Sequence, residues 1–486
     1  MLILLLACVE DTRDTSSPGA NLDDTADTGS DTGTEADWIT PAAPEACGYT
    51  AGSTPGAGTA TLDLVASDFA WDPGTGTLLD TGLAFNGTVP GPLIEANAGD
   101  TVVVNFTNDT DTEMTIHWHG LRITPEMDGV MQMMDPVQPG ESFTYEFHPP
   151  DAGFYWYHPH MSGDTLLERG LYGTMIIREA SEGRADCDLP IVLDDVLLDD
   201  DTRQIAPPDT DMMQLMGRLG NVLMANGRAL RSYEVTRGQT ILLRLVNSSN
   251  ARFWDVRLEG HTMTVVGADS GFLAEPYVAE HLLVVPGERY MVLVEATGEP
   301  GQSYALLNNR FQLHDDEHSS MVEYDPMGEQ ENPVFYLAYG EGEVEGTPWV
   351  QPTPDIPAFE DNVPTTFGHQ WVLDEDMMGG TVTIDGAAWP DVPMVTVQGN
   401  VDTLFEVKND SEMHHPFHIH GNRFQLLAID GVPVEGPPAW KDTWDAPPMS
   451  TLSFASPLDN PGEWMYHCHI LEHAEDGMAG LMTVEE

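Results

Sequence analysis

Positive charge is scarce in this chain. Its 486 residues contain 80 acidic side chains but only 18 lysines and arginines, so the formal net charge is -62 at pH 7. Only two of the cations are lysines, Lys408 and Lys441. Electrostatic repulsion excludes nucleic acid as a partner and argues against an anionic membrane surface. The acidic surface would also concentrate metal ions and amine-bearing compounds, although salt weakens this attraction. Adaptation to a saline habitat is the simpler interpretation.

Long apolar runs and helical periodicity are scarce too. After the first residues, no run is long and apolar enough to cross a bilayer. Segments 101–107 and 240–246 show an alternating residue pattern and are separated from their neighbours by turns rich in glycine, proline and asparagine. This pattern is typical of short strands. Hydrophobic residues make up 41% of the chain, enough for several cores. The composition predicts stacked all-β sandwiches.

The N-terminal segment predicts export. Its apolar run Met1–Cys8 ends in Leu-Leu-Ala-Cys, which resembles the lipobox of a bacterial lipoprotein. The run is short and no positive charge precedes it, so the true start could lie upstream. Residues 10–37 are rich in Asp, Thr, Ser and Gly and predict a disordered tether. We therefore expect a protein of the bacterial cell envelope, periplasmic or attached to the outer membrane through lipidated Cys8.

Histidines, by contrast, are numerous and clustered. Four clusters hold most of the 17 histidines: His117-Trp118-His119, His158-Pro159-His160, His415-Pro416-Phe417-His418-Ile419-His420, and His467-Cys468-His469 followed by His473 and Met478. We interpret each His-x-His pair as serving two metals rather than chelating one. That arrangement suits a metal cluster held between two domains.

The last cluster predicts a blue copper site. A cysteine thiolate, two histidines and a weak axial methionine form its ligand set, which Cys468, His415, His473 and Met478 supply. A copper ion on Cys468 would be joined through the backbone to metals on the flanking histidines. This is a short path for electrons. The axial methionine predicts a low to middle redox potential.

Eight histidines of the clusters remain, enough for one copper with two ligands and a coupled pair with three each. Seven histidines outside these sets are interpreted as ordinary core or surface residues: His148, His261, His281, His314, His318, His369 and His414. His414 could replace His415 if the register shifted by one residue, but the Pro-Phe-His-x-His continuation favours His415.

The clusters, their order and their spacings resemble the multicopper oxidases, specifically three-domain laccase-like bacterial members, over roughly residues 48 to 486. The resemblance implies three consecutive cupredoxin-like Greek-key β-sandwich domains and four copper ions. It assigns the type 2 ligands as His117 and His418, and the two type 3 triads as His119, His158 and His469, and His160, His420 and His467. The segment Pro286-Gly287-Glu288-Arg289-Tyr290 also looks family-like without carrying metal.

The cluster positions suggest an order of domains. We expect a signal and acidic linker at 1–46, a first domain at 47–180 and a second, without ligands, at 181–308. A connecting segment at 309–362 and a third domain at 363–486 complete the chain. The site of the eight histidines must then lie between the first and third domains. Cys47 and Cys187, the two cysteines without another assignment, could form a disulfide in an exported protein.

Protons must reach dioxygen as it is reduced, and carboxylates are the candidate donors. Asp128 matches an acidic position that follows the first cluster in the family. Many bacterial relatives place an acid directly after the second type 1 histidine, where this chain has Ala474, so either Glu472 or Glu475 compensates or the proton path differs. The predicted catalytic residues are Asp128, Cys468 and Glu475.

The expected activity is laccase-like, with four one-electron oxidations of phenols or aromatic amines coupled to reduction of dioxygen to water. Oxidation of Cu(I), Mn(II) or Fe(II) is the alternative, because thioethers suit Cu(I). The methionines that favour it are Met127, Met131, Met133 and Met134, Met212, Met213 and Met216, and Met377 and Met378. A copper-sequestering protein and a copper nitrite reductase fit less well, because neither uses the full set of clusters. The sequence does not predict an oligomeric state.

Overall fold

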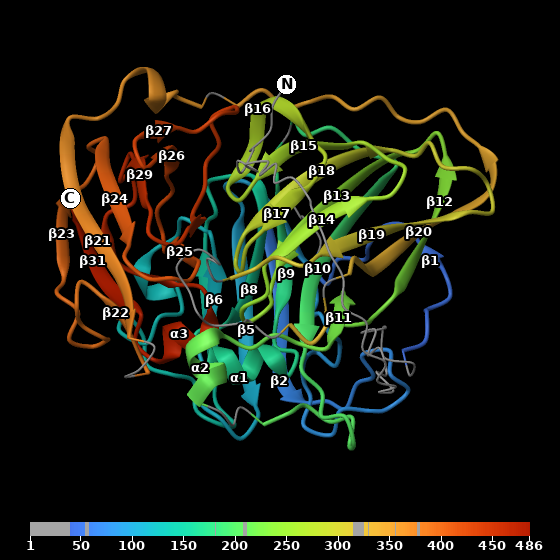
Figure 1. The fold of residues 1–486 in the computed structure, drawn as a ribbon, viewed down its shortest axis with the longest axis horizontal. Helices are drawn as coiled ribbons and strands as arrows, with labels where there is room; N and C mark the ends of the chain where they lie inside the picture. Colours follow the sequence, from blue (N-terminus) through green and yellow to red (C-terminus); the bar gives the residue numbers. More distant parts are fainter. Residues whose placement is uncertain are drawn as a thin grey trace, which may run out of the picture.

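Strands form nearly all of the regular structure, in six sheets that make three consecutive β-sandwiches (Figure 1). The computed structural model describes residues 39–53, 58–179, 181–207, 211–313, 325–328, 330–354, 356–376 and 380–486. In these ranges the α-helices are short: α1 (Gly163–Glu168), α2 (Asp211–Met216) and α3 (Leu471–Glu475). The all-β prediction is confirmed. The strands expected at 101–107 and 240–246 are β5 (Thr101–Asp109) and β13 (Thr240–Asn247).

The first sandwich pairs a sheet of order β3-β2-β5-β7 with one of order β4-β9-β8-β6. Buried and exposed positions alternate along β2, because successive side chains of a strand point to opposite faces. Its core contains Leu64, Phe106 and Tyr157. The elements not yet bounded are β2 (Thr59–Asp68), β3 (Leu83–Phe85), β4 (Ile94–Asn97), β6 (Ile116–His119), the 3-10 turn η1 (Pro125–Met127), β7 (Ser142–Phe147), β8 (Gly153–Pro159) and β9 (Gly173–Arg178).

The second sandwich pairs sheets of order β1-β12-β20-β19-β14-β17 and β11-β10-β13-β18-β15-β16. Its core contains Trp254, Val292 and Phe335. Its further strands are β1 (Glu45–Ala46), β10 (Cys187–Val196), β11 (Val222–Ala225), β12 (Arg231–Arg237), β14 (Trp254–Leu258), β15 (Met263–Ala268), β16 (Gly271–Ala279), β17 (Leu282–Val284), β18 (Arg289–Glu295), β19 (Ser303–Asn309) and β20 (Asn332–Glu343).

The third sandwich pairs sheets of order β22-β21-β24-β29-β26-β27 and β23-β31-β30-β25-β28. Trp371, Phe417 and Tyr466 lie in its core. Its elements are η2 (Phe359–Asp361), β21 (Thr366–Asp376), β22 (Thr381–Ile384), β23 (Val395–Gln398), β24 (Thr403–Asn409), β25 (His415–Ile419), β26 (Gln425–Ile429), β27 (Val432–Pro433), β28 (Thr443–Ala446), β29 (Thr451–Ser456), β30 (Gly462–Cys468) and β31 (Ala479–Glu485).

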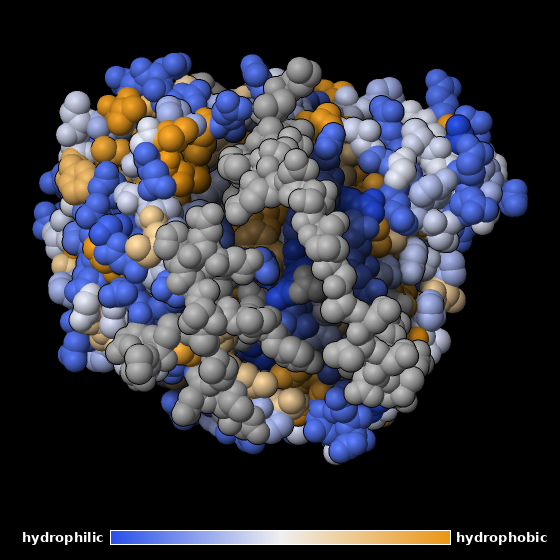
Figure 2. Space-filling model, in the orientation of Figure 1, coloured by the Kyte–Doolittle hydropathy of each residue, from blue (hydrophilic) through white to orange (hydrophobic). Residues whose placement is uncertain are grey.

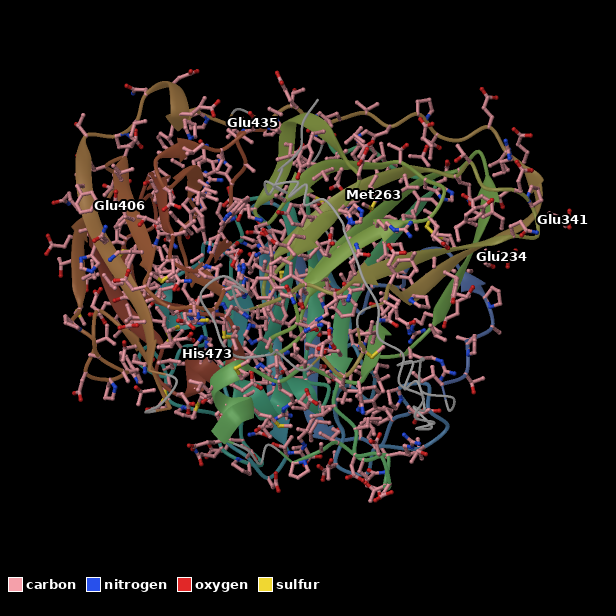
Figure 3. All side chains as sticks on the ribbon, viewed as in Figure 1. Glu234, Met263, Glu341, Glu406, Glu435 and His473 are labelled. Atoms are coloured by element: carbon pink, nitrogen blue, oxygen red, sulfur yellow. A yellow bond between two sulfur atoms is a disulfide. The ribbon has the colours of Figure 1, made fainter. Side chains whose placement is uncertain are left out.

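The first sandwich lies between the other two in Figure 1, with the third at the left and the second at the right. Hydrophilic side chains spread over both outer sandwiches in the same view (Figure 2). Glu406 on β24 and Glu341 on β20 mark the opposite ends (Figure 3). No helix of the described residues has the length and apolar content that a membrane span requires.

Two boundary predictions need correction, although most domain limits stay predictions. The linker expected at 1–46 contains β1, which pairs in parallel with β12. The connecting segment expected at 309–362 contains β20, which pairs with β12 and β19. The glycine, proline and glutamate residues of this segment made β20 look like a loop in the sequence. Its apolar side chains nevertheless pack into the core of the second sandwich.

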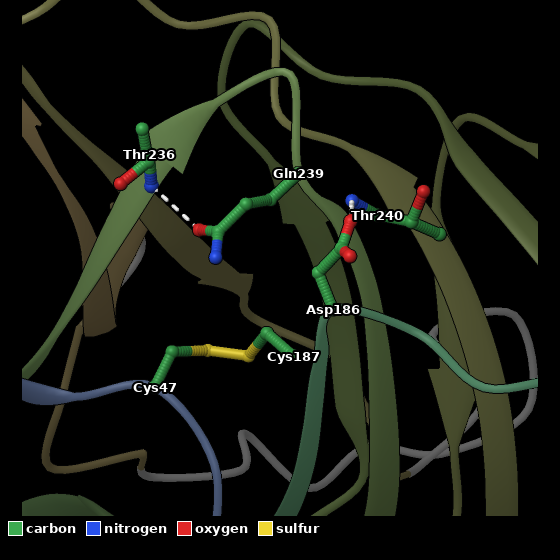
Figure 4. The surroundings of a disulfide bond; sticks show 6 residues. All are labelled: Cys47, Asp186, Cys187, Thr236, Gln239 and Thr240. Atoms are coloured by element: carbon green, nitrogen blue, oxygen red, sulfur yellow. Dashed lines mark hydrogen bonds between the residues drawn. A yellow bond between two sulfur atoms is a disulfide. The ribbon is translucent and has the colours of Figure 1, made fainter. Parts of the chain in front are cut away.

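Cys47 and Cys187 form the hypothesised disulfide, with Cα atoms 5.6 Å apart (Figure 4). Cys47 follows β1, and Cys187 is the first residue of β10. The bond therefore ties the start of the described chain to the second sandwich.

Replacing both residues of this disulfide by serine is expected to lower the free energy of unfolding by about 2–5 kcal/mol, because the bond closes a long loop in the unfolded chain. The two cysteines are separated by 140 residues. Denaturant unfolding of the oxidised protein and the double variant would measure the change. Reduced wild type should match the variant. Equal stability of all three, or free thiols at both positions in the unreduced protein, would refute the bond.

Candidate metal centres

Cys468 ends β30 and faces two histidine rings. Its Sγ is 3.6 Å from Nδ1 of His415 and 3.7 Å from Nδ1 of His473. All three residues are fully buried. Met478 is buried as well, and its carbonyl accepts a hydrogen bond of 3.0 Å from the Cys468 N–H. The structure thus brings together the four residues of the predicted type 1 site.

The protein holds the outer nitrogens of these two rings. Nε2 of His473 donates to the carbonyl of Leu215 in α2 at 2.9 Å, and Nε2 of His415 lies 2.8 Å from Oγ of Ser411. In His473 this bond leaves Nδ1 as the nitrogen that faces sulfur. Burial raises the pKa of the Cys468 thiol far above its ordinary value, so a metal ion must displace a proton to bind the sulfur.

Strand register aligns the other histidine clusters. His117 on β6 lies opposite His158 on β8, and His418 on β25 lies opposite His467 on β30. Directly opposed residues of antiparallel strands share a face. Positions i and i+2 share a face as well, so His119 points to the same side as His117. The second histidines of the other pairs, His160, His420 and His469, come one residue after their strands end. One sheet of the first sandwich and one of the third therefore present histidines.

These two histidine faces meet. Nε2 of His420 lies 3.3 Å from Nε2 of His160 and 3.1 Å from Nε2 of His467, so donors from both sandwiches converge on one point. The rings of His119 and His418 stack with centroids 3.8 Å apart. The predicted location between the first and third domains agrees with these contacts.

Several buried imidazole nitrogens in this cluster have no hydrogen-bond partner. Within the described residues they are Nε2 of His117, Nδ1 of His119, Nε2 of His158, Nε2 of His418 and both ring nitrogens of His469. A buried polar atom without a partner costs about 1–3 kcal/mol, so such a concentration indicates atoms reserved for a ligand. Imidazoles beside a buried thiolate suit copper, and the residues therefore fit the metal that the sequence predicts.

The triads of close donor atoms match the predicted sets in part. His160, His420 and His467 form one triad with donor atoms within 4.8 Å of one another. Another close triad contains His119 and His158 with His117, whereas His469 was expected there, and two further groups join His418 to His117 and His420 and to His119 and Asp442. The ring of His469 is still only 5.0 Å from that of His119.

Asp128 lies at the edge of the histidine cluster and is 1% exposed. Its Oδ2 is 2.8 Å from Nδ1 of His420, and its backbone carbonyl accepts a hydrogen bond of 2.9 Å from Nδ1 of His117. Carboxylates and carbonyls in this position fix the tautomer and orientation of metal-binding histidines. Asp128 therefore contacts histidines of both predicted types of site.

The second predicted acid, Glu475, lies farther from the cluster. Its exposed side chain accepts a hydrogen bond of 2.7 Å from the N–H of Gly163 in α1. Glu472, the alternative, is 1% exposed, accepts from Nδ2 of Asn250 at 2.8 Å, and has its pKa raised to about 7 by burial. No contact between Glu475 and a cluster histidine occurs within the described part of the chain.

The histidines interpreted as ordinary residues have other partners where the structure describes them. His414 contacts Oδ2 of Asp445 at 2.7 Å, so His415 rather than His414 faces Cys468. His148, His261, His281 and His369 also hydrogen-bond away from the cluster. His314 and His318 lie outside the described residues, as do Met377 and Met378.

Comparison with known proteins gives the family. Three multicopper oxidase family models match residues 72–182, 174–326 and 359–486. Multicopper oxidase MmcO of Mycobacterium tuberculosis is 31% identical over 447 residues, covering 82% of each chain. The chain belongs to the multicopper oxidases. Laccase-1 of Botryotinia fuckeliana is 28% identical, covering 83% of this chain and 78% of its own.

Solved structures of multicopper oxidases share the fold. A laccase from Pediococcus acidilactici matches with a TM-score of 0.77 and 27% identity, covering 92% of this chain and 95% of its own. A Campylobacter jejuni multicopper oxidase described as a metallo-oxidase has a TM-score of 0.79 at 24% identity, covering 92% and 96%. The cupredoxin-like prediction is confirmed. This multicopper oxidase is a copper-dependent oxidoreductase that uses oxygen.

Some residues that hold the cluster from outside were not predicted from the sequence. Asp442 and Thr443 contact His119 and His418, and Arg289 contacts Asp442. Arg289 lies in a family-like segment, which was the only available signal. No sequence signal pointed to Asp442, because an aspartate before a threonine is common in an acidic chain.

Proposed function

We propose that this multicopper oxidase is laccase-like, holds four copper ions and couples four one-electron oxidations of phenols or aromatic amines to reduction of dioxygen to water. The proposed ligands are His415, Cys468, His473 and Met478 for type 1, His117 and His418 for type 2, and His119, His158 and His469 with His160, His420 and His467 for type 3. When bound, copper supplies one-electron redox chemistry and a binding place for dioxygen. The chain connects the sites, because Cys468 lies between His467 and His469.

A mostly polar depression with one aromatic lining residue, Phe311, supports an aromatic reductant. The ring of Phe311 is 4.9 Å from that of His414 and stacks on Phe253 at 5.0 Å. His414 directly precedes His415. The depression, of about 350 Å³, is lined by Asn309, Arg310, Phe311, Gln312 and Glu331. The ring of Phe311 offers one aromatic surface to a planar reductant, and this observation carries the laccase-like proposal.

Oxygen uptake by the copper-loaded protein tests the proposal. A phenol and Cu(I) would be supplied in parallel, after the visible spectrum has been recorded. We expect blue absorption and a higher kcat/KM for the phenol. A higher kcat/KM for Cu(I) would move the function to metal oxidation. Blue colour without oxygen uptake would leave a copper-binding protein.

Metal ions are the second candidate reductants, because a buried carboxylate lies beside the type 1 residues. Oε2 of Glu375 is 4.0 Å from Nε2 of His415, and the side chain is 2% exposed. Burial raises the pKa of Glu375 to about 7. The carboxylate is therefore largely charged only above that pH, where it would attract a cation to the type 1 residues.

Glu375→Gln should separate the two reductants. A unit charge about 8 Å from a cation is worth about 2 kcal/mol at an effective dielectric constant of about 20, or about 30-fold in kcat/KM. At pH 8 we expect a loss of that order for a cationic metal reductant and little change for a neutral phenol. The matched control is Glu406→Gln, a carboxylate on the outer face of β24 (Figure 3). Equal losses for both reductants would remove the metal-ion candidate.

Asp128 is the proposed proton relay to oxygen. Its buried carboxylate contacts His420 and lies 3.4 Å from Nδ1 of His117, and its Oδ1 has no hydrogen-bond partner in the described structure. These contacts support the proposal, because they bring the carboxylate of Asp128 to the edge of the cluster. Glu475 is proposed as the second acid, at the contact between α3 and the N-terminus of α1.

We also propose that the protein is exported to the cell envelope, where lipidated Cys8 would anchor it. The lipobox-like segment supports export, although it lies outside the described residues. The disulfide supports it independently, because such bonds persist in oxidising compartments.

A further inference from the structure

Asp442 and Thr443, which bracket the start of β28, hold one histidine from each histidine-bearing sandwich. Oδ1 of Asp442 is 3.2 Å from Nε2 of His119, and its backbone carbonyl accepts from Nδ1 of His418 at 3.0 Å. Oγ1 of Thr443 lies 3.2 Å and 3.0 Å from the same two nitrogens. The nitrogens left without a partner are Nδ1 of His119 and Nε2 of His418. This small unit therefore selects which ring nitrogen each histidine offers to a metal.

The second sandwich fixes the carboxylate of Asp442. Arg289, the first residue of β18, places Nη1 2.6 Å from Oδ1 and Nη2 2.7 Å from Oδ2 of Asp442. Both side chains are at most 1% exposed. Two parallel charge-assisted bonds allow the carboxylate one orientation. Asp269 fixes the backbone of both residues, because its carboxylate oxygens accept hydrogen bonds from the N–H groups of Arg289 at 2.9 Å and Asp442 at 3.0 Å.

The backbone is shaped to let these groups meet. A β-carbon at Gly287 would lie 2.8 Å from Cδ2 of His469 and 2.9 Å from Cε1 of His119, so only glycine fits. Gly120, directly after His119, has φ of +88°, and a β-carbon there would overlap Nη2 of Arg289. The loop before β18 thus packs against the rings of His469 and His119, and the turn after β6 packs against Arg289 and Asp442.

We propose that Arg289 is a positioning residue for the trinuclear centre, acting through Asp442 on His119 and His418. The second sandwich carries none of the proposed ligands, yet it supplies the Arg289 guanidinium that sets the orientation of two of them. Asp442 acts as an orienting group rather than a ligand, because both its oxygens are engaged by Arg289 and Oδ1 also accepts from Thr443 at 2.9 Å. The inference rests on the proposed function for the assignment of His418 to type 2 copper and His119 to type 3 copper.

Arg289→Met tests this role. Loss of an outer partner of a metal ligand costs about 10- to 100-fold in metal affinity, so dialysed Arg289→Met should lose type 2 copper. We expect less bound copper by elemental analysis and a weaker type 2 signal by electron paramagnetic resonance. The blue absorption should stay, because all four type 1 residues lie in the third sandwich. Arg289→Lys, which keeps the charge but not the parallel fork, should lie between wild type and Arg289→Met.

Arg252→Met is the matched control. Arg252 is 3% exposed and makes a comparable fork, with Nη1 2.9 Å and Nη2 3.1 Å from the two carboxylate oxygens of Asp325. It lies in the same sandwich but contacts no cluster histidine among the described residues. We expect Arg252→Met to lose a comparable amount of thermal stability but to keep the type 2 signal. This result would distinguish a general effect on folding from an effect on the orientation of the histidines.

Two outcomes would overturn the inference. One is a wild-type type 2 signal and copper content in Arg289→Met, or in Arg289→Lys if the methionine variant does not fold. The other is an equal loss of type 2 copper in the Arg252→Met control. A wild-type protein that is blue but has no type 2 signal would instead overturn the four-copper proposal, and this inference with it.

Discussion

Cys468→Ser is expected to remove the blue absorption and to reduce oxygen uptake below detection. Serine offers a hard, protonated oxygen where a type 1 site needs a soft thiolate. The same substitution removes the sulfur from the connection between His415 and His473 on one side and His467 and His469 on the other. Visible and paramagnetic resonance spectra of the copper-loaded variant, with oxygen uptake, would measure both effects.

The type 2 signal should survive in Cys468→Ser, because its proposed ligands lie on other strands. The Cys47→Ser, Cys187→Ser double variant is the control for replacing cysteine by serine away from the type 1 site, and it should stay blue. A blue Cys468→Ser protein would show that the sulfur of the type 1 site has been assigned wrongly.

His160→Ala should produce the opposite pattern, a blue protein that does not turn over oxygen. Nε2 of His160 converges with those of His420 and His467, and it is the contribution of the first sandwich to that triad. Loss of a ligand should lower kcat by more than about 100-fold, since even outer partners cost about 10- to 100-fold. Stopped-flow reduction of the blue centre, which should stay fast, and steady-state oxygen uptake would separate the two steps.

The control for His160→Ala is His148→Ala. His148 is an exposed histidine of the same sandwich, with Nε2 3.1 Å from Oγ1 of Thr101. It should keep wild-type turnover. Turnover within a few fold of wild type in His160→Ala would remove His160 from the trinuclear centre.

The residues that meet at the two centres could be predicted because their chemistry shows in residue type and spacing. Cys468 between two histidines indicates a metal by itself, and the Pro-Phe-His-x-His continuation favoured His415 over His414, as the structure has it. Alternation predicted β5 and β13. These signals are local, so one sequence contains them.

The contacts that hold the cluster could not be predicted because they depend on how the sandwiches pack. Arg289 and Asp442 lie 153 residues apart and in different sandwiches. Nothing in either neighbourhood indicates the other. β20 was not predicted because its glycine and glutamate residues interrupt the strand pattern. β1 was not predicted because a strand of two residues has no periodicity. Glu375 becomes notable only when its strand is seen beside His415.

The two residues of β1 have a consequence for the order in which the chain matures. They precede the whole first sandwich in the sequence, yet they pair with β12 of the second. Cys47, the residue directly after β1, is bonded to Cys187 at the start of β10. Domains usually fold as units from the N-terminus during synthesis. Here β1 cannot pair with β12 until about 190 further residues of the chain have been synthesised. Until then β1 has no strand to pair with.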